Sequence, residues 1–132
     1  MHRLRLLRTR RATQLVAAVA LVAGVSSALA QEVSGEKLFR QQCATCHAVV
    51  ENEPHRQGST LWGVVGRKAG AFADFDYSPA FRKSMSGKVL TEALIDAWIT
   101  DPQVLAPGAV MAYQQHDAEK RKIIIDYLKT LK

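Results

Sequence analysis

The stretch QQCATCHAVV, residues 41–50, contains both cysteines of the 132-residue chain, separated by two residues, with a histidine directly behind the second. Taken alone, Cys43, Cys46 and His47 fit four kinds of site: a disulfide, a zinc site, a thiol redox couple, or a covalent attachment point for haem. The remainder of the sequence must distinguish between them.

The chain begins with a segment typical of an export signal. Residues 1–14 carry five arginines and no acid, residues 15–30 are mostly apolar, and Ala28-Leu29-Ala30 has the small-x-small form of a cleavage site. The apolar run is shorter than the roughly 20 residues that span a bilayer, which disfavours a retained anchor. We therefore expect a signal peptide over residues 1–30, a single domain over residues 31–132, and a periplasmic location.

The net charge of the whole chain, +6, belongs largely to this first segment. Five of the 18 basic residues lie in it and all 12 acidic residues follow it, so residues 31–132 carry a formal charge of +1. A nearly neutral domain offers no general attraction to nucleic acid or to an anionic membrane surface. We expect neither partner.

Three stretches of residues 31–132 have helical patterns. Ser34, Thr91 and Asp117 are candidate N-caps for helices that reach Gln42, Thr100 and Leu131, respectively. Glycine and proline punctuate the chain between residues 48 and 110, and no alternating strand pattern is evident. The sequence predicts an all-α domain with three main helices and long loops. A domain of about a hundred residues has a thin core, so a large apolar cofactor would help to fill it.

The alternatives for the cysteine pair differ in what else they require. A disulfide across two intervening residues closes a very small loop and stabilises little. A zinc site needs further ligands, for which only His55 and His116 remain in the domain. A thioredoxin-like couple would follow a strand, and none precedes Cys43. C-x-x-C-H in an exported chain favours covalent haem, with two thioethers to the porphyrin and an adjacent imidazole for the iron.

Haem held in this way predicts a second axial ligand far away in the sequence. Met111 follows Pro107-Gly108 in a stiff turn, whereas Met85 lies in the polar stretch KSMSGK and Met1 lies in the predicted signal. Methionine is more often a packing residue than a ligand. The turn nevertheless makes Met111 the predicted partner of His47 across the iron.

With these residues in place, the chain resembles the class I cytochrome c family over nearly the whole of residues 31–132. The resemblance rests on the order and spacing of short motifs: GEKLF (35–39), CATCH (43–47), GSTLWGVVGRKAG (58–70), DFDYS (74–78), PGAVM (107–111) and the final R-x-x-I-I-x-Y-L-K (121–129). It implies one domain wrapped around a single covalently attached haem c.

The resemblance also implies roles for individual residues. Gly35 and Phe39 would cross Tyr127 of the last helix, and the carbonyl of Ser59 would accept a hydrogen bond from the His47 ring. In the haem pocket, Arg67 and Tyr77 would reach the propionates, and Tyr113 would lie beside the exposed haem edge.

Five positions depart from the family pattern. Ser59 replaces a proline and Val110 a lysine, and the other three concern bonds to the methionine and the propionates. Trp98 replaces a tyrosine that contacts the methionine sulfur, so a bond to Met111 has to come from the indole N–H or is lost. Leu90 and Ala109 replace propionate donors, namely a tryptophan and a threonine, so two of the family's propionate donors are absent.

An iron with histidine and methionine ligands has no open position, which favours single-electron transfer over catalysis. We therefore expect a monomeric electron carrier, not an enzyme. Its transient partners would be a quinol-oxidising complex, a terminal oxidase, a reductase, a photosynthetic reaction centre or a dehydrogenase. The alternatives are a dedicated subunit of a periplasmic dehydrogenase, a peroxidase and a haem-based sensor, the last two of which need an open iron position.

Overall fold

A computed structural model describes residues 35–132, and these residues form an all-α structure. Its first helix runs over residues 35–42. The helices that follow are α2 (Pro79–Met85), α3 (Glu92–Thr100), α4 (Pro102–Leu105) and α5 (Ala118–Thr130). Extended pairing among the described residues is limited to one isolated bridge between Lys68 and Val89. The predicted all-α fold is confirmed. The predicted signal, residues 1–30, and the cap Ser34 lie outside the described residues.

Two of the predicted helices begin at the predicted caps. The Thr91 hydroxyl accepts a hydrogen bond from the Leu94 N–H at 3.2 Å, and the Asp117 carboxylate accepts from Glu119 and Lys120 at 3.0 and 3.2 Å. Each side chain satisfies N–H groups that have no partner within the first helical turn. The helices that carry most of the core therefore start where local hydrogen-bonding chemistry dictates.

The structure adds two short helices to a region that the sequence predicts as loop. Both begin with proline in the first turn, α2 at Pro79 and α4 at Pro102. Ser78 caps α2 by accepting from the Phe81 N–H at 3.3 Å, and Asp101 caps α4 by accepting from the Gln103 N–H at 2.9 Å. Proline is well suited to a first helical position because it has no N–H to satisfy and its φ is already helical.

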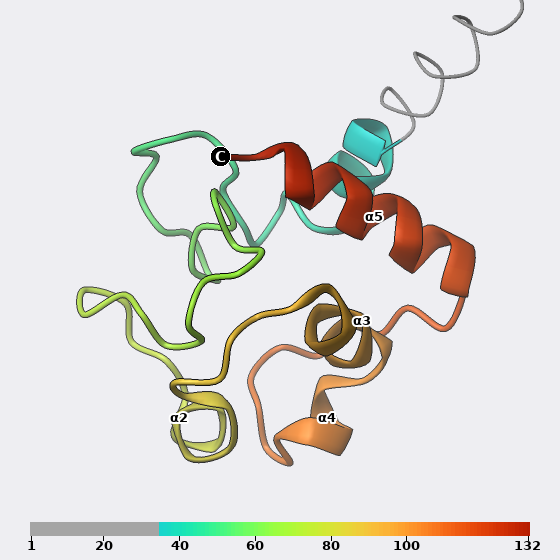
Figure 1. Ribbon diagram of the computed structural model, residues 1–132. Helices are drawn as coiled ribbons and strands as arrows, with labels where there is room; N and C mark the ends of the chain where they lie inside the picture. Colours follow the sequence, from blue (N-terminus) through green and yellow to red (C-terminus); the bar gives the residue numbers. More distant parts are fainter. Residues whose placement is uncertain (1–34) are drawn as a thin grey trace, which may run out of the picture. The chain divides into compact units, whose positions relative to one another are not determined.

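The first helix crosses α5 closely, as Figure 1 shows at the upper right. A Cβ atom added to Gly35 would lie 3.0 Å from the Tyr127 Cβ and 3.2 Å from the Ile123 carbonyl oxygen. The rings of Phe39 and Tyr127 meet with their centroids 5.5 Å apart. The predicted crossing of Gly35 and Phe39 with Tyr127 is confirmed.

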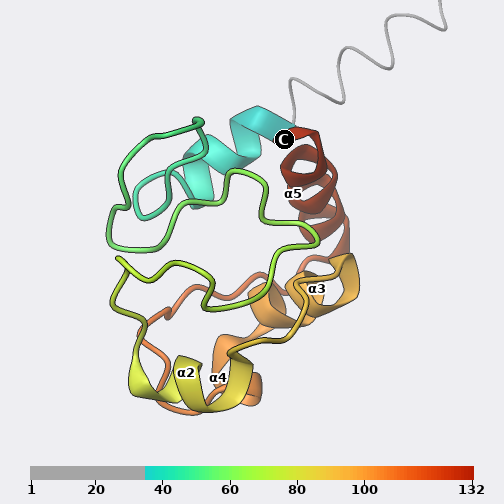
Figure 2. The ribbon, with the colours of Figure 1, turned by 60° about the vertical axis from the view of Figure 1, so that its left-hand side comes forward.

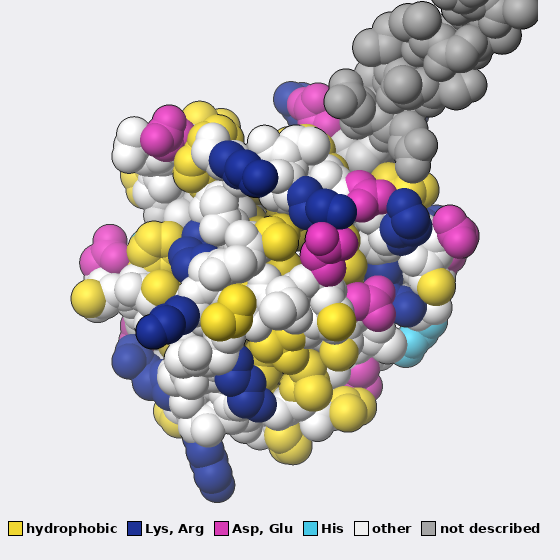
Figure 3. All heavy atoms as spheres, viewed as in Figure 1, with side chains coloured by type: hydrophobic (Ala, Val, Ile, Leu, Met, Phe, Trp, Pro, Cys, Tyr) yellow, Lys and Arg dark blue, Asp and Glu magenta, His cyan; other side chains and the backbone are white. Residues whose placement is uncertain are grey.

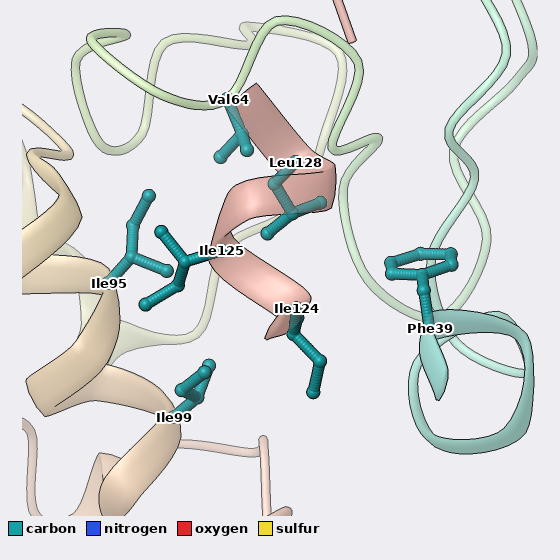
Figure 4. Packing of buried hydrophobic residues seen from close by; sticks show 7 residues of the cluster. All are labelled: Phe39, Val64, Ile95, Ile99, Ile124, Ile125 and Leu128. Carbon is teal, nitrogen blue, oxygen red and sulfur yellow. The ribbon is translucent and has the colours of Figure 1, made fainter. Parts of the chain in front are cut away.

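The main core lies where α3 and α5 pack together, with the first helix alongside. Figure 4 shows the side chains of Ile95 and Ile99 on α3 directed toward α5. The whole cluster consists of Phe39, Val64, Ile95, Ile99, Ile124, Ile125 and Leu128. Figure 2 shows α3 and α5 on one side of the domain and most of the irregular segment 43–78 on the other. The helical core and the irregular segment therefore face each other across the domain.

A second, smaller core cluster surrounds Met85, which is 0% exposed. Met85 packs there with Ala69, Ala106 and Ala109.

None of the described helices is both long and apolar enough to cross a membrane.

Candidate haem-binding site

The CATCH segment continues the first helix as a tight turn. The Cys43 N–H donates to the Phe39 carbonyl at 2.8 Å, and the Cys46 and His47 N–H groups both donate to the Cys43 carbonyl, at 3.1 and 3.0 Å. In such a turn, side chains three and four positions apart lie on the same side. The two thiols and the imidazole therefore face a common space.

That space is a cavity of about 730 Å³, which lies within the roughly 300–1,000 Å³ typical of cofactor sites. Its walls come from the CATCH turn, residues 57–78, α2, α3, α5 and the segment after α4. All eight site residues predicted from the sequence border it: Cys43, Cys46, His47, Arg67, Tyr77, Trp98, Met111 and Tyr113. The fold thus brings together residues separated by up to 70 positions.

The His47 ring is held in one orientation. Its Nδ1 lies 2.7 Å from the carbonyl oxygen of Ser59, the contact expected from the family resemblance. Burial lowers the pKa of His47, although the Ser59 carbonyl acts in the opposite direction. Both effects suit a metal ligand: the ring is neutral near pH 7, and a proton on Nδ1 leaves Nε2 free to donate its lone pair.

Gly58 makes this arrangement possible. A Cβ atom at position 58 would lie 2.2 Å from the His47 Cε1 and within 2.7 Å of both ring nitrogens. Carbon atoms do not approach so closely without bonding, so the ring lies in space that any side chain would fill. Gly58 also donates its N–H to the Cys46 carbonyl at 2.8 Å, which fixes it against the CATCH turn.

The two thiols are separate and suit covalent attachment better than metal binding. Burial, reinforced by the neighbouring Cys46, raises the pKa of Cys43 to about 11, so this sulfur is protonated at neutral pH. Zinc needs thiolates and usually four ligands. Within residues 35–132, no group of three or more His, Cys, Asp or Glu side chains is placed to hold a metal ion.

Met111 borders the cavity, and its sulfur is in contact with Trp98. The indole Nε1–H of Trp98 donates to the Met111 Sδ at 3.1 Å, so the indole makes the bond that the replaced tyrosine would otherwise make. The ring of Trp98 is itself fixed edge-on against Phe81 at 5.3 Å between centroids. Met85, in contrast, does not border the cavity and is enclosed in the second core cluster.

Replacing Trp98 with phenylalanine should lower the reduction potential of the haem-loaded protein by about 20–40 mV. An N–H bond draws electron density from the sulfur and so favours the ferrous form. Loss of a bond worth about 1 kcal/mol shifts a one-electron couple by this order. Potentiometric titration would measure the shift. Tyr127→Phe, which removes a polar group from an aromatic ring that does not border the cavity, serves as the control and should leave the potential within about 10 mV of wild type.

Arg67 and Tyr77 both belong to the irregular segment 43–78 and follow the CATCH turn in the sequence. The Arg67 guanidinium donates to the carbonyls of Trp62 and Thr60 at 2.6 and 2.8 Å and lies over the ring of Phe72, 4.5 Å from its centroid. Burial lowers the pKa of Arg67 while leaving it cationic. Tyr77 is buried and stacked on Phe81 with centroids 5.0 Å apart. The cavity is therefore lined by the fixed guanidinium of Arg67 and by the phenol of Tyr77.

Tyr113 belongs to a small polar cluster that sequence reasoning did not identify. Its hydroxyl donates to the Gln42 Oε1, and the Gln115 Nε2 donates to the same oxygen at 2.8 Å. Burial raises the pKa of Tyr113, so the hydroxyl remains protonated and able to donate. The cluster ties the end of the first helix to the segment that follows Met111.

Charge is distributed unevenly over the domain surface. Figure 3 shows acidic and basic side chains side by side over α5, where the Lys122 Nζ lies 2.6 Å from the Asp126 carboxylate. Basic side chains gather over α2, which carries Arg82 and Lys83 in its last turn. The exposed residues that border the cavity are nearly neutral: Gln57, Lys68, Asp76, Pro79, Val110 and Ala112.

These residues fit haem c. Two thiols and an oriented neutral imidazole occupy one wall, a thioether borders the same space, and most of the lining is apolar. Attachment would consume the thiols, and the imidazole and the thioether are the donors that cytochromes of the c type offer to iron.

Comparison with known proteins agrees with this fit. A family model described as "Cytochrome c" matches residues 33–132. The chain is 41% identical to cytochrome c2 of Rhodopila globiformis over 101 residues, which cover 76% of the chain and 92% of that protein. It is 36% identical to cytochrome c type-1 of Ascaris suum, over 73% of the chain and 84% of that protein. The chain therefore belongs to the cytochrome c family, whose members carry covalently attached haem c and transfer electrons.

Proposed function

We propose that this protein is a monohaem electron carrier in which Cys43 and Cys46 hold the haem and His47 and Met111 ligate its iron. The observation that carries the proposal is the convergence of these four side chains on one cavity. His47 is already oriented by the Ser59 carbonyl, and Met111 is already held through its sulfur by Trp98. Both ligands are fixed by the protein, so little rearrangement would accompany a change of oxidation state.

Bound haem c supplies an iron that gains or loses one electron. The surrounding residues set how easily this happens. Apolar side chains such as Val64, Ile95 and Leu128 border the cavity and exclude water. A low-dielectric lining disfavours the additional positive charge of the ferric form, so we infer a positive reduction potential. Arg67 would balance the propionate charge together with the Tyr77 hydroxyl, whereas Leu90 and Ala109 offer no side-chain donor.

Electrons would pass through the edge of the cavity near Tyr113, where Val110 is 82% exposed. This edge carries little charge, which suits brief contacts with other redox proteins. We propose as partners the classes expected above: a quinol-oxidising complex, a terminal oxidase, a reductase, a reaction centre or a dehydrogenase.

We also propose that residues 1–30 direct the chain to the periplasm and are removed after Ala30. The family match covers residues 33–132 and so lies wholly after the proposed cleavage site. Haem attachment to a C-x-x-C-H motif is also compatible with an exported chain.

The test is to express the whole chain with haem-attachment machinery in a bacterium and to study the purified periplasmic protein. Its mass should equal that of residues 31–132 plus one haem after denaturation, and potentiometry should give a single reversible one-electron wave at positive potential. A mass without haem, or retention of residues 1–30, would refute the corresponding part of the proposal. A wave at strongly negative potential would refute His47–Met111 ligation.

A further inference from the structure

The side-chain amide of Gln103 makes three hydrogen bonds to the backbone of the segment that ends at Met111. Its Nε2 donates to the Ala109 carbonyl at 2.9 Å and to the Met111 carbonyl at 3.3 Å. Its Oε1 accepts from the Gly108 N–H at 3.0 Å. One neutral amide thus uses both its donor and acceptor groups on residues 106–111, which we term the methionine loop.

Gln103 is well placed to hold this loop because its own backbone is fixed. It is the second residue of α4, and its N–H is bound by the Asp101 carboxylate at 2.9 Å. Pro102, directly before it, is fully buried. The Ala106 N–H returns to the Pro102 carbonyl at 2.9 Å and closes the turn. Figure 1 shows α4 directly followed by the segment that carries Met111.

Apart from Ala106 and Ala109, which are buried in the second core cluster, the methionine loop is exposed or only partly buried. Val110 is 82% exposed, and Gly108 adopts a φ of +88°, a conformation that glycine alone adopts readily. Within the loop, the Ala109 N–H donates to the Ala106 carbonyl at 2.9 Å. In the described part of the chain, the carbonyls of residues 109 and 111 accept hydrogen bonds from Gln103 alone.

We propose that Gln103 is a positioning residue that keeps Met111 on the haem iron by holding the backbone of the methionine loop. This inference rests on the proposed ligation by His47 and Met111. Trp98 and Gln103 act on different parts of the same residue, since the indole holds the sulfur and the amide holds the main chain. Without the amide, the loop opens more often, and the iron is exposed to other ligands more of the time.

The experiment measures how readily a competing ligand displaces Met111. Imidazole is titrated into the ferric haem-loaded protein, and binding is followed by visible absorption. Gln103→Met retains the length and helix preference of the side chain but makes none of the three hydrogen bonds. It should bind imidazole about tenfold more tightly than wild type, because the open state that accepts the ligand becomes about tenfold more populated.

A second measurement reads the loop directly. Hydrogen exchange of the Gly108 amide should be about tenfold faster in Gln103→Met, since the acceptor for this N–H is gone. Val104→Ala is the matched control, because Val104 is the next residue of α4 and is 75% exposed. It should stay within about twofold of wild type in both measurements.

The outcomes separate the two proposals. If Gln103→Met matches wild type in imidazole binding, or if Val104→Ala changes as much, Gln103 does not position Met111. Met111→Leu tests the ligation itself, since an iron without the methionine should bind imidazole much more tightly than either α4 variant. If Met111→Leu instead binds imidazole like wild type, Met111 is not the ligand and both proposals fail.

Discussion

Replacing Met111 with leucine should lower the reduction potential of the haem-loaded protein by at least about 0.1 V, within the roughly 0.8 V range over which axial ligands tune haem iron. Leucine has similar volume and no lone pair, so the cavity remains filled while the iron loses its second protein ligand. A thioether favours the ferrous state, and its loss removes that preference. The variant should also bind carbon monoxide when reduced.

Met85→Leu is the matched control for this change. Met85 is completely buried in the second core cluster and does not border the cavity. The same substitution there should leave the potential within about 20 mV of wild type and cost less than about 1.5 kcal/mol of stability. If Met85→Leu lowers the potential and Met111→Leu does not, the ligand assignment is wrong.

Replacing Gly58 with alanine should destabilise the haem-loaded protein by about 3 kcal/mol or more and reduce the fraction of protein that carries haem. The added Cβ would lie 2.2 Å from the His47 Cε1. The ring cannot move without losing the Ser59 carbonyl, which lies 2.7 Å from its Nδ1. Overpacking of a filled site and loss of a buried hydrogen bond act together. Guanidinium unfolding followed at the haem absorption band measures the change.

Gly66→Ala separates this steric effect from a general intolerance of glycine substitution. Gly66 has a φ of +87°, and a Cβ placed there would meet no atom within 4 Å. Its replacement should cost only the backbone strain, about 1–2 kcal/mol, and leave haem loading unchanged. Equal losses of haem in both variants would show that contact with His47 is not the cause.

The main helices could be predicted because their signals are local. Thr91 and Asp117 stand directly before runs with helical spacing of apolar residues, and the structure uses both as caps. α2 and α4 were not predicted, because the first has two turns and the second has one. Helices this short do not contain enough apolar residues to show helical spacing in the sequence. Pro79 and Pro102 are also ambiguous signals, because proline is found both at the first position of a helix and just after its end.

The candidate site shows a similar division between local and distant signals. CATCH and the turn before Met111 are recognisable because their chemistry is carried by neighbouring residues. Gln42, Gln103 and Gln115 could not be recognised, since a neutral amide carries no distinctive pattern. The partners of Gln42 are also 71 and 73 positions away. Whether Trp98 bonds the Met111 sulfur depends on how α3 meets the methionine loop, which the sequence alone does not specify.

The most direct test of His47–Met111 ligation is the visible spectrum of the purified wild-type protein, recorded oxidised and then reduced under carbon monoxide. Ligation by both residues predicts a weak methionine-to-iron band at the red end of the oxidised spectrum and no rapid change of the reduced spectrum when carbon monoxide is added. An oxidised spectrum without that band, together with fast carbon monoxide binding, would contradict it.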